Sequence, residues 1–271
     1  MARGIVAAGH PHTAAAAGEI LAAGGNAFDA VVAAHFAACV AEPVLASLGG
    51  GGFLLARTAA GTELLYDFFT HTPLRRRPRR ELDFHPILAD FGTATQEFHV
   101  GMGAIACPGT VKGLFRIQRE LGRLPMRRLV EPAVALARGG VRVNALQGYI
   151  FDIVGAIYRE DPAVCALYAP ASTSARLARR GERIRQPLLA DTLETLAREG
   201  EALFYRGELG RRLVADCRER GGHLTLDDLA RYRVMRRRPL ELLYRGARVL
   251  TNPAPSAGGM LIAFALRLLE A

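Results

Sequence analysis

The chain is organised around residues 47–73, which read SLGGGGFLLARTAAGTELLYDFFTHTP. Four consecutive glycines, Gly49 to Gly52, lead into two apolar runs, at 53–55 and 64–66, and the second run ends at Asp67. This pattern predicts a β-hairpin entered through a backbone that only glycine can adopt. Glycine reaches positive φ and lets another group approach the main chain closely, at an entropic cost of roughly 0.5–1 kcal/mol per residue. Four such costs in a row indicate a geometric need, either tight packing or a ligand against the backbone.

The composition is that of an ordinary globular protein. Of 271 residues, half are hydrophobic and 23% are charged. No period of 20–50 residues repeats, and no low-complexity linker divides the chain. We therefore expect a single region over residues 1–271, of α/β or α+β class, with a helix-rich part at 110–235.

Local signals place several elements. A helix is expected from residue 27 to about residue 40, with Asn26 as its N-cap and Asp29 in its first turn. The sequence TLDD at 225–228 predicts a capping box at the start of another helix. The remaining expectations are a strand at 4–8, an irregular connection at 73–90, a helix at 129–138 with Pro132 in its first turn, and a hairpin at 240–250.

Charge and hydropathy limit the partners that we expect. The net charge is +9, and Lys112 is the only lysine beside 34 arginines. The densest basic cluster, RRRPRR at 75–80, has no pattern of stacking aromatic residues, so we expect a solvated loop and no nucleic-acid partner. The longest apolar stretch, at 30–41, is too short to cross a membrane. Residues 1–4 resemble no signal peptide, which favours a cytoplasmic location.

The residues alone reveal no catalytic constellation. The four cysteines form no C-x-x-C pair and the histidines form no H-E-x-x-H motif, so no metal is expected. The GxGxxA match at 101–106 is interrupted by Pro108-Gly109 before any helix begins, so no nucleotide cofactor is expected. No serine lies in a G-x-S-x-G elbow. The chain therefore shows no recognisable nucleophile with its base.

The order of several longer motifs carries more information. The segment GIVAAGHPHTAAAAGEILAAGGNAFDAVVAAHFAACVAEP and the following SLGGGGF resemble the opening of the γ-glutamyltranspeptidase family. ACPGTVKGL at 106–114 is similar to that family's V-P-G-x-V-x-G-L motif. RLPMRRLVEPAVALARGGVRV at 123–143, GGHLTLDDLARYRV at 221–234 and NPAPSAGG at 252–259 also resemble family segments in the expected order. The resemblance covers residues 4 to about 270.

The resemblance implies an N-terminal-nucleophile hydrolase with an αββα sandwich and no cofactor. In this family a precursor cleaves itself before a threonine, whose own α-amine then serves as the base for attack on a γ-glutamyl amide. The chain contains no Thr-Thr-His-like segment, so it resembles the large-subunit portion, incomplete at its C-terminus, with no catalytic residue of its own. The implied partners are a small γ-glutamyl peptide or amide substrate and the missing small-subunit segment.

One motif departs from the family. The motif after the hairpin is D-x-R-E-x-A-P, whose arginine holds the substrate α-carboxylate, whereas residues 67–73 read DFFTHTP and place Phe69 at the arginine position. A bidentate guanidinium–carboxylate contact is strong and specific. Either a nearby arginine recognises the donor, or the acyl group is not a γ-glutamyl amino acid. The candidate substrate-binding residues are Asp67, Phe69, Thr70 and Arg75, and the structural loop is Gly49, Gly50, Gly51 and Gly52.

Three functions remain open at this point. The first is the N-terminal segment of a γ-glutamyltransferase-like amide hydrolase or acyltransferase, or its variant that acts on another amide. The second is a catalytically silent structural or binding paralogue. A basic nucleic-acid-binding protein is the third, and its binding would fall steeply with salt.

Overall fold

A computed structural model describes residues 4–270. The helical half is built on α1 (Pro11–Ala22) and α2 (Ala27–Ala41), which pack against each other. The predicted N-cap Asn26 is confirmed, and together with Asp29 it forms a capping box at the start of α2. The buried Asp29 carboxylate also accepts the backbone N–H groups of Arg123 and Leu124, so the cap fastens α2 to the corner that precedes α4.

The predicted hairpin is confirmed. Strands β1 (Phe53–Arg57) and β2 (Glu63–Asp67) are antiparallel, with Phe53 opposite Asp67. A third strand, β7 (Met235–Arg237), pairs antiparallel with β2 and places Met235 opposite Asp67. The sheet order is β1-β2-β7, so the end of the hairpin lies beside a segment from far along the chain.

The other strands form three two-stranded ribbons. Their members are β3 (His85–Asp90) with β4 (Thr95–Val100), β5 (Val141–Arg142) with β6 (Arg183–Ile184), and β8 (Leu240–Tyr244) with β9 (Ala247–Thr251). Short 3-10 turns occur at η1 (Arg79–Glu81) and η2 (Met102–Ala104). The C-terminal hairpin was predicted. The prediction of an irregular connection at 73–90 is wrong for its last six residues, which pair with β4.

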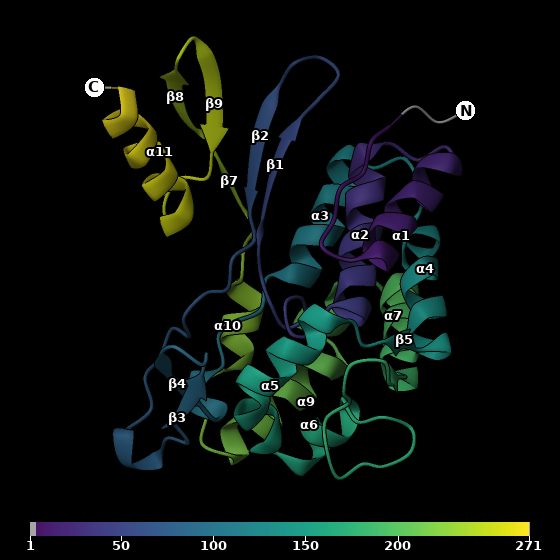
Figure 1. Cartoon of the computed structure of the whole chain (residues 1–271), viewed down its shortest axis with the longest axis vertical. Helices are drawn as coiled ribbons and strands as arrows, with labels where there is room; N and C mark the ends of the chain where they lie inside the picture. The colour runs from purple at the N-terminus through teal and green to yellow at the C-terminus, as the bar shows by residue number, and fades with distance from the viewer. Residues whose placement is uncertain (1–3, 271) are drawn as a thin grey trace.

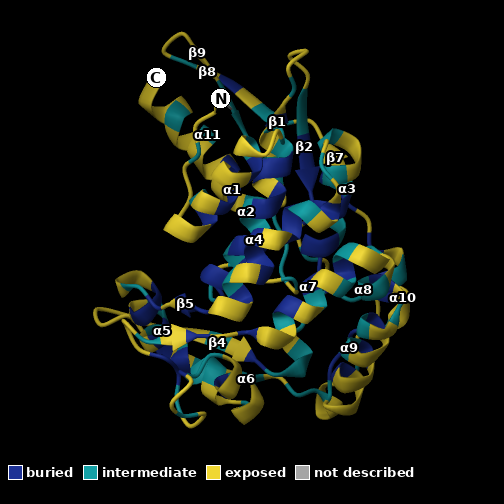
Figure 2. Cartoon of the chain, turned by 90° about the vertical axis from the view of Figure 1, so that its right-hand side faces the viewer, coloured by how far each residue is buried: buried dark blue, intermediate teal, exposed yellow. Residues whose placement is uncertain are grey.

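The remaining helices fill out the body of the molecule. They are α3 (Thr110–Leu121), α4 (Met126–Gly139), α5 (Ala145–Arg159), α6 (Pro162–Leu167), α7 (Pro187–Glu199), α8 (Ala202–Tyr205), α9 (Glu208–Glu219), α10 (Leu226–Arg231) and α11 (Ala257–Glu270). The main core lies among α2, α3, α4 and α7, and the ribbon of its buried residues is dark blue in Figure 2. A smaller apolar cluster lies around α5 and α6.

Two local predictions are wrong for physical reasons. Residues 4–8 form no strand, because they are largely exposed and pair with no other strand. Pro132 lies inside α4 and not in its first turn, since the helix begins at Met126. Pro132 is buried beside Leu129 and Ala133, and burial of this helix face offsets the hydrogen bond that proline cannot make.

The β-hairpins lie at opposite ends of the molecule. In Figure 1 the β1–β2 hairpin and the unit of β8, β9 and α11 lie at one end, and β3 and β4 lie at the other. Helix α11 packs on β8 and β9 but leaves most of its large apolar side chains exposed. These are Met260, Leu261, Ile262, Phe264, Leu268 and Leu269.

Candidate functional site

The candidate site begins where strand β2 ends, at Asp67. This residue is buried, and its Oδ2 accepts a hydrogen bond from Arg237 Nε at 2.6 Å. Its Oδ1 accepts the backbone N–H of Phe69 at 3.0 Å. Arg237 belongs to β7, so a side chain from the late part of the chain fixes the turn that follows the hairpin. Both carboxylate oxygens therefore have structural partners.

The next residues, Phe69 to His71, are held from several sides. Phe69 is 45% exposed, and its ring stacks on that of Phe53, with centroids 5.6 Å apart and an interplanar angle of 19°. The Tyr232 hydroxyl donates to the carbonyl oxygen of Phe69 at 2.8 Å. His71 exchanges two backbone hydrogen bonds with Cys107, of 3.1 and 2.8 Å, and its ring lies 4.6 Å from that of Tyr232. We call residues 67–71 the substrate loop, because Asp67, Phe69 and Thr70 are three of the residues that the sequence predicts to bind substrate.

The glycine run packs directly on this loop. A Cβ atom at Gly51 would lie 2.6 Å from Thr70 N and 2.7 Å from Phe68 O, and one at Gly52 would lie 3.0 Å from the Phe68 ring. None of the four glycines has a positive φ, so the expectation of a conformation restricted to glycine is wrong. Here the requirement is a close approach between two backbones, which a side chain would prevent.

The start of α3 completes the packing. Gly50 O accepts the N–H groups of Gly109 and Thr110, at 2.8 and 3.1 Å. A Cβ atom at Gly109 would lie only 1.9 Å from Phe68 O and 2.2 Å from the Tyr232 hydroxyl. The backbone of the substrate loop thus packs against the glycine run, Gly109 and Tyr232.

Lys112 contacts Tyr232, the residue that donates to the substrate loop. Its Nζ donates to the carbonyl oxygen of Tyr232 at 2.9 Å and lies 4.4 Å from the centre of the Tyr205 ring. Burial lowers the pKa of Lys112, and burial raises the pKa values of Tyr205 and Tyr232. Both phenols therefore stay protonated near neutral pH and act as donors, Tyr205 to Pro108 O at 2.9 Å.

Sequence reasoning missed three members of this site, namely Lys112, Tyr232 and Arg237. The single lysine in an arginine-rich chain was a signal that could have marked Lys112. Tyr232 and Arg237 carry no local signal, because their role depends on tertiary contacts.

The matches with known proteins concern nearly the whole chain. The family model described as gamma-glutamyltranspeptidase matches residues 13–271. The chain belongs to the γ-glutamyltranspeptidase family. It is 35% identical to an acylase ACY 1 proenzyme of Pseudomonas sp. strain V22 over 99% of this chain and 48% of the relative. It is 32% identical to a glutathione hydrolase proenzyme of Escherichia coli K12 over 93% of this chain and 42% of that relative. The chain thus spans about half the length of the curated γ-glutamyltranspeptidase-family relatives that it matches.

Solved structures agree on the fold. The γ-glutamyltranspeptidase of Helicobacter pylori superposes with a TM-score of 0.85 at 27% identity, covering 98% of this chain and 74% of that one. The transpeptidase CapD of Bacillus anthracis gives a TM-score of 0.77 at 26% identity, covering 99% and 82%. The mixed helix-and-strand fold of an N-terminal-nucleophile hydrolase is therefore confirmed for this γ-glutamyltranspeptidase-family chain.

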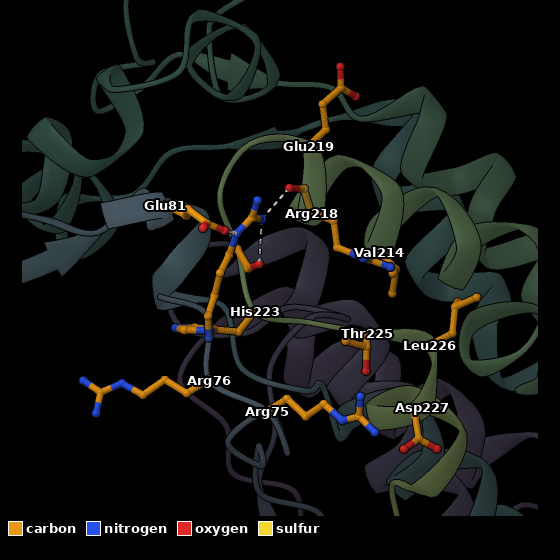
Figure 3. Close-up of a pocket in the computed structure, with 12 residues that line it drawn as sticks. Arg75, Arg76, Glu81, Val214, Arg218, Glu219, His223, Thr225, Leu226 and Asp227 are labelled. Atoms are coloured by element: carbon orange, nitrogen blue, oxygen red, sulfur yellow. Dashed lines mark hydrogen bonds and ion pairs between the residues drawn. The ribbon is translucent and has the colours of Figure 1, made fainter. Parts of the chain in front are cut away.

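Arg75 does not join the other candidate residues. It lines a hollow of about 860 Å³, together with Arg76, His223 and Asp227, whereas Asp67, Phe69 and Thr70 do not line that hollow. Figure 3 shows Arg75 and Arg76 pointing toward opposite sides of it. The structure thus groups Asp67, Phe69 and Thr70 with the glycine run of this γ-glutamyltranspeptidase-family chain, and sets Arg75 apart.

Within residues 4–270, no helix combines the length and apolar character needed to cross a membrane. In the same part of the chain, no three histidine, cysteine or acidic side chains converge as metal ligands would.

Proposed function

We propose that this chain is the N-terminal, large-subunit portion of an amide hydrolase or acyltransferase whose nucleophilic threonine lies downstream of Ala271. Two observations support this. Residues 13–271 match the family, and the chain spans about half the length of the curated relatives. The exposed apolar side chains of α11 give the same indication, because such a surface is normally covered by another part of a protein.

The proposed reaction is acyl transfer. The threonine hydroxyl attacks the amide carbon while its own α-amine accepts the proton, and the amine of the substrate leaves. Water or an amine acceptor then cleaves the resulting acyl ester and regenerates the threonine. The role of the present chain is to supply one wall of the acyl site through the substrate loop.

The test of this proposal is direct. We expect the full-length gene product to cleave itself into two pieces, and mass spectrometry of the smaller piece to find threonine at its N-terminus. Replacement of that threonine by alanine should leave a single uncleaved chain. An absent threonine, or an uncleaved product without amidase activity, would favour the silent binding paralogue.

The acyl group that we propose is one without a free α-carboxylate. Phe69 and Phe53 present a stacked apolar surface, and the guanidinium of Arg237 is engaged by Asp67. Arg75 lies in a different hollow. The ACY 1 relatives, whose name is acylase, fit this choice. A γ-glutamyl amide would bring a carboxylate to a loop where Phe69 replaces the arginine, while Arg237 is paired with Asp67 and Arg75 lies elsewhere.

We therefore expect weak turnover of a γ-glutamyl anilide and faster turnover of a phenylacetyl anilide. Phe69→Arg should raise γ-glutamyl turnover by about 10- to 100-fold, since a charged hydrogen-bonded contact contributes about 1.5–3 kcal/mol. Phe69→Leu is the control, because it removes the ring without adding charge. Robust turnover of the γ-glutamyl anilide by the unchanged enzyme would show that this interpretation of Phe69 is wrong.

Location and other partners stay predictions from the sequence. We propose a cytoplasmic location, which cell fractionation would test. We also propose that nucleic acid is not a partner; salt-dependent binding of DNA or RNA would contradict this.

A further inference from the structure

A separate cavity of about 320 Å³ lies against the glycine run, and we call it the glycine-run cavity. Gly50 and Gly51 form part of its wall, so it adjoins the substrate loop without including Asp67, Phe69 or Thr70. The side chains that matter for its chemistry are His35, Ser47, Thr110, Tyr158 and Tyr168. Its volume falls in the range of small-molecule sites, roughly 300–1,000 Å³.

The lining carries no charged side chain, although charged residues make up 23% of the chain. Burial lowers the pKa of His35, so this imidazole is neutral at physiological pH. Moving an ionised group into such a site without a partner is costly. The cavity is therefore suited to an uncharged molecule.

Thr110 supplies an unsatisfied hydrogen-bonding group. The residue is fully buried at the start of α3, and its Oγ1 has no hydrogen-bond partner among residues 4–270. Buried hydroxyls are normally paired, so an unpaired one beside a cavity requires an explanation. The imidazole of His35 also lines the cavity and packs edge to face on the Phe68 ring, with the ring centroids 6.3 Å apart. A neutral imidazole offers one donor and one acceptor, and a hydroxyl offers both.

Two aromatic side chains also line the cavity. The rings of Tyr158 and Tyr168 pack edge to face, with centroids 4.9 Å apart. Burial raises the pKa of each phenol, so both rings stay neutral. The cavity thus combines an apolar, aromatic side with a pair of neutral hydrogen-bonding side chains.

We propose that the glycine-run cavity binds a small uncharged molecule that carries a primary amide on an apolar or aromatic body. The amide carbonyl accepts from the Thr110 hydroxyl, and an amide N–H donates to the unprotonated nitrogen of His35. The body lies against Tyr158 and Tyr168. This proposal concerns binding alone and does not depend on the proposed reaction.

The test uses benzamide as the probe and benzoate as its charged isostere, with the full-length gene product and binding measured by ligand-observed NMR and calorimetry. We expect benzamide to bind at least tenfold more tightly than benzoate. Thr110→Val keeps the side-chain shape and removes the hydroxyl, so it should weaken benzamide binding by tenfold or more. The matched control is Thr195→Val on α7, whose hydroxyl donates to its own helix and whose loss should leave binding unchanged.

A second variant keeps the test decisive if Thr110→Val does not fold. Gly50→Ala would place a methyl group 3.3 Å from the Ser47 carbonyl oxygen, 3.4 Å from Ser47 Oγ and 3.6 Å from Thr110 Oγ1, with no positive φ to strain it. It should abolish benzamide binding while the far-ultraviolet circular dichroism stays unchanged. The proposal is overturned if benzamide does not bind, if benzoate binds equally well, or if a folded Thr110→Val or Gly50→Ala variant binds benzamide like the unchanged protein. A product that binds benzamide but neither cleaves itself nor turns over amides would refute the proposed function and leave this inference standing.

Discussion

The ion pair between Asp67 and Arg237 should respond unequally to the loss of its two members. The Asp67 side chain is 2% exposed, whereas that of Arg237 is 37% exposed. Arg237→Met leaves a buried carboxylate without its cation, which costs about 3 kcal/mol at the lower end of such measurements. Asp67→Asn can still accept the Phe69 N–H, and water can solvate the freed guanidinium, so its cost is about 1 kcal/mol.

The double variant gives the sharpest result. Asp67→Asn combined with Arg237→Met removes the uncompensated charge, so it should be more stable than Arg237→Met alone by about 1–2 kcal/mol. Arg236→Met is the matched control, because Arg236 lies next to Arg237 on β7 and has no ion pair among the described residues; it should change stability by less than about 0.5 kcal/mol.

Urea unfolding followed by circular dichroism measures these free energies, since the chain has no tryptophan to report by fluorescence. The reasoning would be refuted if Asp67→Asn cost as much as Arg237→Met, or if the two costs were simply additive in the double variant.

Three further predictions concern two glycines, the reactivity of buried thiols and the pH dependence of stability. Gly109→Ala should destabilise the fold by about 3 kcal/mol or more, because the new Cβ atom would lie 1.9 Å from Phe68 O. Gly18→Ala in the exposed face of α1, with no atom within 4 Å, should stabilise it by about 0.5–1 kcal/mol, and the reverse order in urea unfolding would contradict the packing described above. Burial raises the pKa values of Cys39 and Cys107 to about 12, so both thiols should react slowly with iodoacetamide at pH 8 until urea is added. Between pH 9 and 12 the unfolded chain releases these protons while the native chain keeps them, so the free energy of unfolding should fall as pH rises; a flat profile there would contradict the burial of the thiols.

Local signals in the sequence identified local structure well. The caps at Asn26 and Thr225 depend on side chains within three residues, and both capping boxes are present. The β1–β2 hairpin follows from its two apolar runs and the turn between them. A strand at 4–8 was predicted from apolar residues alone, and it fails because a strand also needs a partner, which periodicity does not reveal.

The candidate site was predictable only where its members are neighbours in the sequence. Asp67, Phe69 and Thr70 lie together because they follow one another. Arg75 lies elsewhere because the Leu74 N–H donates to Asp228 Oδ1 at 2.6 Å, which draws the chain toward α10. Tyr232 and Phe69 are separated by 163 positions, and no residue pattern in the sequence predicts their contact.

The pairing of Asp67 with Arg237 also orders events during synthesis. The two residues are separated by 170 positions. At a translation rate of 5–20 residues per second, the ribosome needs roughly 10–30 s to add the intervening chain. Helices α1 and α2 can pair during that interval, whereas the Asp67 carboxylate has no ion-pair partner until Arg237 has been synthesised. The substrate loop is therefore among the last parts of this chain to mature on the ribosome, and a nascent chain stalled before β7 should expose it to protease.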